Sequence, residues 1–312
     1  MIEVRELTKV FDAKTAVNSV SFTVEKGEIL GFLGPNGAGK STTMRMITGF
    51  LPPSSGTAVI GGCDIVGDSL NARRKIGYLP ENAPVYREMR VTDFLNFCAE
   101  VRGVDSGSQQ ARVDETIEKC FLSDVRFQTV ATLSKGFKQR VCFAQSILHD
   151  PEYLIFDEPT DGLDPNQKHE VRLMIREMAA EKAIILSTHI LDEVDAVCSR
   201  AIIIANGKIV ADDTPEGLKA TSPTHGSLMV RITAEEPNAL LMLLKAEPGV
   251  KAAEILEQSD RHARIRIFPE NPDAPPIADR ILAMLSDRSA TVHSLLVEEG
   301  RLDEVFRAIT TS

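Results

Sequence analysis

The sequence predicts an α/β protein with a mixed sheet core, an antiparallel β subdomain, a helical subdomain and a small α+β C-terminal domain. Two observations support this prediction. Short apolar runs recur between segments of helical periodicity, and a strand pattern restarts after a loop-forming stretch at residues 221–226. The 312 residues, 43% of them hydrophobic, also exceed the usual size of one hydrophobic core. We therefore expect two domains, residues 1–221 and 222–312.

The first domain is expected to open with antiparallel strands, because Ile2–Leu7 and Val20–Glu25 alternate apolar and polar residues. Continuous apolar runs are typical of buried core strands. These runs are Ile29–Leu33, Tyr153–Phe156, Ala183–Leu186 and Ala201–Ile204. Residues 82–150 instead have helical periodicity, which predicts an inserted helical subdomain. Its predicted helices are Val91–Val101, Ala111–Phe121 and Gly136–Leu148.

The C-terminal domain is expected to have a ferredoxin-like β-α-β-β-α-β order and one further helix. The expected elements are the strand Leu228–Ile232, the helix Pro237–Glu247, the strands Val250–Leu256 and Ala263–Phe268, the helix Pro276–Ser286, the strand Ala290–Val297 and the helix Leu302–Ile309. Three arginines, Arg261, Arg264 and Arg266, could form a ligand patch. Because apolar residues alternate with them, the pattern favours the solvated face of an ordinary strand.

A phosphate-binding loop connects the strand Ile29–Leu33 to a helix predicted over Ser41–Gly49. Its residues are Gly34, Pro35, Asn36, Gly37, Ala38, Gly39, Lys40 and Ser41, and Thr42 follows in the first turn of the helix. Glycines let backbone N–H groups turn toward phosphates, Lys40 can reach the β- and γ-oxygens, and the Ser41 hydroxyl can ligate Mg²⁺. The motif therefore predicts binding of a nucleoside triphosphate.

Two adjacent carboxylates, Asp157 and Glu158, end the apolar run Tyr153–Phe156. Beside a phosphate loop, carboxylates at such a strand end bind Mg²⁺ and orient the attacking water. We expect Asp157 to hold the metal shell and Glu158 to act as general base or to orient the water. The alternative is that both acids cap the next turn, since Pro159 and Gly162 follow.

Ser134 and Gly136 precede a long helical pattern, so the Ser134 hydroxyl and the Gly136 N–H are expected at a helix N-terminus that can bind an anion. Five ordered motifs now stand in the first 220 residues. They are the phosphate loop, Leu133-Ser134-Lys135-Gly136, the strand ending in Asp157-Glu158, Gly162-Leu163-Asp164 and Ser187-Thr188-His189. Together they resemble the ATPase subunit of ABC transporters, and the fold is then expected to be a P-loop NTPase of the ABC type.

The resemblance implies that ATP is held between two copies of the chain, or between this chain and a closely related ATPase subunit. Ser134 and Gly136 would contact the γ-phosphate bound by the partner, and His189 would touch the γ-phosphate of its own copy. Asp164 would contact the partner, and it could equally cap the helix that Pro165 begins. Phe11 stands where the family stacks an aromatic on adenine, and the alternative for Phe11 is a core position.

Two positions depart from the family pattern. Glu81, in Gly77-Tyr78-Leu79-Pro80-Glu81, stands where the family has a glutamine that reaches toward Mg²⁺. A carboxylate also suits a hard cation, so Glu81 is a candidate metal ligand together with Ser41 and Asp157. The second departure is in the motif Leu133–Phe137, which we call the signature. It carries Lys135 and Phe137 where the family has glycine and glutamine. The Ser134 and Gly136 contacts remain possible, but the residues beside them differ.

The motif at residues 77–81, the signature and Arg301-Leu302-Asp303-Glu304-Val305-Phe306 look like the exporter branch, which includes gliding-motility and multidrug ATPase subunits. In that branch a separate integral-membrane permease docks on the helical subdomain. The candidate contact residues are Tyr86, Arg87, Met89 and Arg90, with Phe94 nearby; alternatively they only pack the subdomain. Other functions left open are a soluble ABC ATPase with a non-transport partner and an ATP sensor without turnover. The C-terminal domain is expected to support dimerisation or regulation.

The composition excludes several other classes. The formal net charge of −10 and the lack of a basic, aromatic-rich cluster argue against nucleic acid as a partner. Five widely spaced cysteines without a C-x-x-C pair argue against disulfides or a zinc site. No apolar stretch approaches the ~20 residues that span a bilayer. We therefore expect a cytoplasmic protein that is peripheral on the inner face of the cell membrane through the permease.

Overall fold

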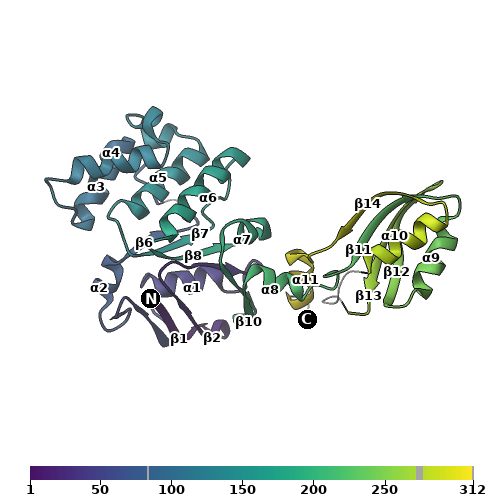
Figure 1. The fold of residues 1–312 in the computed structure, drawn as a ribbon. Helices are drawn as coiled ribbons and strands as arrows, with labels where there is room; N and C mark the ends of the chain where they lie inside the picture. Colours follow the sequence, from purple (N-terminus) through teal and green to yellow (C-terminus); the bar gives the residue numbers. More distant parts are fainter. Residues whose placement is uncertain (83, 272–276, 311–312) are drawn as a thin grey trace. The chain divides into compact units, whose positions relative to one another are not determined.

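The computed structural model describes residues 1–312 except 83, 272–276 and 311–312. The chain divides into two compact units, Met1–Pro215 and Glu216–Ser312 (Figure 1). The helix α8 (Pro215–Ala220) begins at this division. Buried apolar side chains form two clusters in the first unit and one in the second, so each unit has its own core.

A six-stranded sheet in the order β10-β9-β3-β8-β7-β6 lies at the centre of the first unit. Its strands are β3 (Ile29–Leu33), β6 (Ile76–Leu79), β7 (Tyr153–Asp157), β8 (Ala183–Thr188), β9 (Arg200–Ala205) and β10 (Lys208–Asp213). Only β10 runs antiparallel to its neighbour. Every residue of β3, β7 and β8 is buried, as expected for parallel strands covered on both faces. The four apolar runs in the sequence are four adjacent strands.

The alternating segments at the N-terminus form a separate antiparallel sheet in the order β2-β1-β4-β5. Its strands are β1 (Ile2–Phe11), β2 (Lys14–Val24), β4 (Ser55–Ile60) and β5 (Cys63–Asp64). Their inward side chains pack with α1 (Lys40–Ile47) against one face of the central sheet, where Phe22 and Phe32 have ring centroids 5.5 Å apart. The phosphate loop therefore lies where the two sheets meet.

Helices cover the opposite face of the central sheet (Figure 1). They are α3 (Val91–Arg102), α4 (Gln109–Lys119), α5 (Lys135–Ile147), α6 (Pro165–Ala179) and α7 (Leu191–Val197), while the short α2 (Ser69–Arg74) precedes β6. The ring of Phe143 on α5 lies 4.9 Å from that of Phe156 on β7. This packing fixes the helical subdomain to the strand that ends in the two carboxylates.

The second unit contains a four-stranded antiparallel sheet in the order β12-β13-β11-β14, which is the ferredoxin-like arrangement. Its elements are β11 (Leu228–Thr233), α9 (Pro237–Ala246), β12 (Val250–Ser259), β13 (His262–Pro269), α10 (Ala278–Asp287), β14 (Thr291–Val297) and α11 (Leu302–Thr310). Pro276, where the sequence places the start of the second helix, lies outside the described residues. Side chains of α9 and α10 pack on one face of the sheet, and we call the opposite one the open face.

No helix in the described ranges combines the length and apolarity that a membrane span requires. The five cysteines carry free thiols, and three of them are buried.

Candidate nucleotide site

The phosphate loop needs glycine at three of its positions. Gly37 and Gly39 have left-handed φ angles of 80° and 111°. A Cβ on Gly34 would lie 2.5 Å from the Ile204 carbonyl oxygen on β9, so the loop could not pass so close to the sheet with a larger residue. The helix α1 begins at Lys40, and its first N–H groups have no helical acceptor. The loop and this helix end form a cradle for an anion.

Lys40 lies over the loop and is buried, with 6% of its surface exposed. Its Nζ donates a hydrogen bond to the Gly34 carbonyl oxygen at 2.6 Å. Burial lowers the Lys40 pKa, while the charges of Glu158, Asp157 and Glu81 act in the opposite direction. Glu81 therefore lies close enough for its charge to act on this ammonium group. Thr42 follows in the first turn of α1 and is half-buried.

Asp157 ends β7 and is fully buried. Its Oδ1 accepts hydrogen bonds from the hydroxyls of Ser41, at 3.3 Å, and Ser187. Its Oδ2 is buried and has no hydrogen-bond partner among the described residues. Oxygen donors of this kind suit Mg²⁺, which usually takes one or two carboxylates together with water and phosphate oxygens. In the described ranges no three His, Cys, Asp or Glu side chains cluster as a metal site, so the residues present fit a phosphate-linked cation rather than an all-protein cage.

Glu158 and His189 meet at the ends of β7 and β8. The Glu158 Oε2 lies 2.9 Å from the His189 Nδ1, and the histidine side chain is 51% exposed whereas the glutamate is 11% exposed. Burial raises the pKa of Glu158, and the hydrogen bond from His189 and the charge of Lys40 partly oppose this effect. Glu158 is also held in a left-handed conformation with φ 54°. A carboxylate with a raised pKa that faces solvent through an imidazole is suited to proton transfer.

The signature residues form a second cluster at the N-terminus of α5. The Ser134 Oγ accepts a hydrogen bond from the Phe137 N–H at 3.3 Å, so Ser134 caps the helix. A Cβ on Gly136 would lie 2.6 Å from the Gln167 Oε1, because the start of α6 packs against this turn. Lys135 bridges to Asp161 with 2.7 Å between Nζ and Oδ2. Within the described part of the chain, no hydrogen bond joins this cluster to the phosphate loop.

The structure also shows what surrounds two further predicted site residues, Asp164 and Phe11. Asp164 caps α6 by accepting a hydrogen bond from the Gln167 N–H at 2.9 Å, with Pro165 in the first helical position. Phe11, at the end of β1, is 45% exposed, and the Lys9 Nζ lies 5.2 Å from the centre of its ring. The core alternative for Phe11 is therefore wrong: the ring is exposed, with the Lys9 ammonium over it. Asn36 and Pro35 are exposed in the loop, and Ala38 is buried.

Sequence reasoning missed Glu193 on α7. This carboxylate is 1% exposed and accepts hydrogen bonds from the hydroxyls of Thr160 and Thr188, the latter at 2.8 Å. Thr188 directly precedes His189, and Thr160 follows Glu158 by two residues. Glu193 therefore ties together the two strand ends that carry the catalytic candidates. The only sequence signal was a threonine at or shortly after the end of each strand, which did not identify a partner.

The candidate permease surface is only partly exposed. Tyr86 is 57% exposed, and its ring meets the exposed Phe97 ring edge-on with centroids 5.4 Å apart. Arg87 and Arg90 are also exposed. Met89 is half-buried against the helical core and Phe94 is 2% exposed, so these two residues pack the subdomain.

The chain matches the family model described as ABC transporter over residues 17–161. The probable multidrug ABC transporter ATP-binding protein YbhF of Escherichia coli is 39% identical over 223 residues, which are 71% of this chain and 38% of YbhF. The chain thus spans well under half of the length of that relative. The daunorubicin/doxorubicin resistance ATP-binding protein DrrA of Streptomyces peucetius is 34% identical over 313 residues, covering 99% of this chain and 92% of DrrA.

Structural similarity agrees with these sequence matches. The solved structure of an ATP-binding subunit of an ABC transporter superposes on 70% of this chain and 92% of its own, with a TM-score of 0.66 and 31% identity.

Proposed function

This chain belongs to the ABC transporter ATP-binding proteins, and from that premise we propose that it is the ATP-hydrolysing subunit of an exporter. Two copies would close on ATP, and their opening after hydrolysis would drive a separate membrane permease. The observation that carries the proposal is the convergence of Lys40, Ser41, Asp157, Glu158 and His189 beside the carboxyl ends of β3, β7 and β8. Ligands of open α/β sheets bind at this edge.

The first group of residues would bind the nucleotide and its cation. Lys40 and the loop N–H groups would hold the β- and γ-phosphates. Ser41 and the unsatisfied Oδ2 of Asp157 would hold Mg²⁺, which when bound neutralises charge on the phosphate oxygens. Glu81 would be a further oxygen ligand, which its charge effect on Lys40 supports. Phe11 would stack on the base.

The second group would perform the chemistry. Glu158 would accept a proton from the attacking water, a role that its raised pKa favours because the base is then better matched to neutral pH. His189, hydrogen-bonded to that carboxylate, would orient it and contact the γ-phosphate. Glu193 would position both residues through Thr160 and Thr188.

A complete site would require a second copy of the chain. The N–H groups of Lys135 and Gly136 start α5 and have no helical acceptor, which leaves an anion-binding helix end outside the phosphate loop of the same chain. In a head-to-tail dimer, this end would face the γ-phosphate bound by the partner.

Mixing two inactive variants tests this arrangement. Lys40→Ala removes the phosphate lysine, and Ser134→Arg blocks the signature; each variant alone should lose ATP hydrolysis. In an equimolar mixture, half of the pairs are mixed and each of them has one intact composite site, so about a quarter of the wild-type rate should return. A mixture as inactive as its components would contradict the shared site, as would a Ser134→Arg protein with wild-type turnover. Circular dichroism of each variant controls for folding.

The names of the similar proteins support export: YbhF is named as a probable multidrug transporter component and DrrA as a drug-resistance protein. The exposed pair Tyr86 and Phe97 would be the contact for the permease, since aromatic residues are enriched at protein interfaces. Through it the chain would lie on the inner face of the membrane. Tyr86→Ala should weaken co-purification with a permease encoded nearby while the ATPase rate of the isolated chain stays unchanged.

A further inference from the structure

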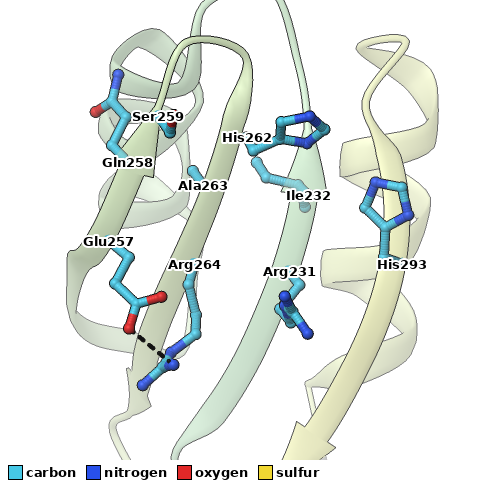
Figure 2. A pocket seen from close by; sticks show the side chains of 9 residues that line it. All are labelled: Arg231, Ile232, Glu257, Gln258, Ser259, His262, Ala263, Arg264 and His293. Atoms are coloured by element: carbon cyan, nitrogen blue, oxygen red, sulfur yellow. Dashed lines mark ion pairs between the residues drawn. The ribbon is translucent and has the colours of Figure 1, made fainter.

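The open face of the C-terminal sheet contains a hollow of about 490 Å³, within the size range of small-ligand pockets (Figure 2). Basic side chains from three strands line it. Arg231 comes from β11, His262 and Arg264 come from β13, and His293 comes from β14, while Glu257 of β12 lies at one side. The hollow lies entirely within the second unit and shares no residue with the nucleotide site.

Two arginines are directly opposite each other in this hollow. Arg231 and Arg264 are partners in the antiparallel ladder between β11 and β13. Their neighbours Val230, Ile232 and Ile265 point into the core, so both guanidinium groups belong to the open face. Like charges directly opposite each other destabilise a sheet. This placement therefore has a cost, which an anionic ligand bound between the two arginines would reduce.

Neither guanidinium is saturated by the protein. The Arg231 guanidinium makes no hydrogen bond or ion pair with any residue that the structure describes. Among the described residues, Arg264 has one ion pair, with 3.0 Å between its NH1 and the Glu257 Oε1, and its buried Nε has no hydrogen-bond partner. Several N–H donors of the two forks therefore remain available.

The third arginine of this face shows the contrast. Arg266 is held by Glu298, whose Oε2 lies 2.7 Å from its Nε and whose Oε1 lies 3.1 Å from its NH2, and Glu254 lies 3.7 Å away. Its side chain is 15% exposed. The protein thus neutralises one arginine with two carboxylates and leaves the neighbouring pair with one exposed glutamate.

Two histidines complete the hollow. The Thr233 hydroxyl lies 2.8 Å from the His262 Nδ1 and 2.7 Å from the His293 Nε2. Since a hydroxyl carries a single proton, it donates to one ring and accepts from the other, and both rings are held in place. The other nitrogen of each imidazole has no hydrogen-bond partner in the described part of the chain, so it can contact a ligand. The ring centroids lie 6.2 Å apart.

We propose that this hollow binds a small oxyanion, with the phosphate or carboxylate group of the ligand held between Arg231 and Arg264. A guanidinium fork matches two oxygens of either group, which is why arginine recognises both. Two arginines against one glutamate give the hollow an excess positive charge. His262 and His293 contact the remainder of the ligand.

Nuclear magnetic resonance of the histidine rings tests the proposal on the full chain. Inorganic phosphate is titrated at constant ionic strength with sodium chloride as balance, and succinate is titrated in parallel as the carboxylate probe. His262 and His293 are assigned through His262→Gln and His293→Gln. We expect saturable shifts of both signals with at least one probe. Arg231→Gln and Arg264→Gln should each weaken binding about tenfold or more, since each removes a charge-assisted contact.

Arg261→Gln is the matched control. Arg261 is a 68% exposed arginine 3.7 Å from Glu235 and outside the hollow, so this variant should bind as the wild type does. Without phosphate, Arg231→Gln should melt no lower than the wild type, because it removes repulsion between like charges. Signals that move linearly without saturation, or equal binding by Arg231→Gln and wild type, would overturn the proposal. The His189 signal reports phosphate binding at the nucleotide site. A failure of the oxyanion proposal can therefore be distinguished from a failure of the proposed ATPase function.

Discussion

Replacing Glu158 by glutamine is the sharpest test of the chemistry. Glutamine has nearly the same shape and can keep a hydrogen bond to the His189 Nδ1, which lies 2.9 Å from the carboxylate in the wild type. The substitution therefore removes the basic group and leaves its position filled. General base catalysis contributes about 10²- to 10⁴-fold in rate. We expect the maximal rate of ATP hydrolysis to fall by that factor, which corresponds to about 3–5 kcal/mol in the activation barrier.

A loss of folding stability should not account for the lower ATPase rate of Glu158→Gln. Burial is the main cause of the raised Glu158 pKa, so the folded state disfavours the charged form relative to the unfolded chain. A carboxyl with a raised folded pKa lowers stability as pH rises through that region, and glutamine removes this penalty. At neutral pH the variant should unfold at a urea concentration equal to or higher than that of the wild type.

The assay is phosphate release at saturating ATP and Mg²⁺, with nucleotide affinity measured separately. The wild-type rate should fall at acidic pH. Because the Glu158 pKa is raised, this fall should begin at a pH above the usual pKa range of a glutamate side chain. Glu152→Gln, at an exposed position just before β7, should retain wild-type activity. A Glu158→Gln protein that keeps its nucleotide affinity and turns over within about threefold of wild type would refute the assigned role.

Three further substitutions test the fold through urea denaturation. Phe156→Ala should lower the free energy of unfolding by about 3–5 kcal/mol, because it empties a fully buried position beside Phe143; a loss under about 1 kcal/mol would contradict that packing. Asp164→Ala should cost about 1 kcal/mol through the lost helix cap, and Asp164→Asn should recover most of it. Burial lowers the pKa of His149 from 6.5 to about 4. The folded state therefore disfavours the charged imidazole, and the protein should lose stability as pH falls from 6.5 to 4. The loss, up to about 3 kcal/mol, should vanish in His149→Gln; equal pH dependence in both proteins would be evidence against it.

Local patterns were sufficient for most of the fold. Burial on both faces produces continuous apolar strands, so Ile29–Leu33 and Tyr153–Phe156 were recognisable without any knowledge of their neighbours. One-sided burial produces alternation, which identified the sheet that carries Ala263, Ile265 and Ile267. The phosphate loop was equally readable, because its glycines are required by local backbone geometry.

Contacts between distant side chains were not predictable in the same way. Glu193 looks like any acidic residue of an exposed helix turn, and only the folded chain brings Thr160 to it. The bridge from Lys135 to Asp161 and the opposition of Arg231 to Arg264 depend on packing and on strand register, neither of which periodicity encodes.

The backbone of Glu158 has a consequence for engineering. A residue other than glycine in a left-handed conformation costs about 1 kcal/mol, and Glu158, with φ 54°, bears this cost at the position proposed for the base. Glycine or asparagine would adopt the same conformation more readily. Directed evolution that selects only for thermal stability should therefore favour those residues at position 158. The resulting variants would be more stable but would no longer hydrolyse ATP.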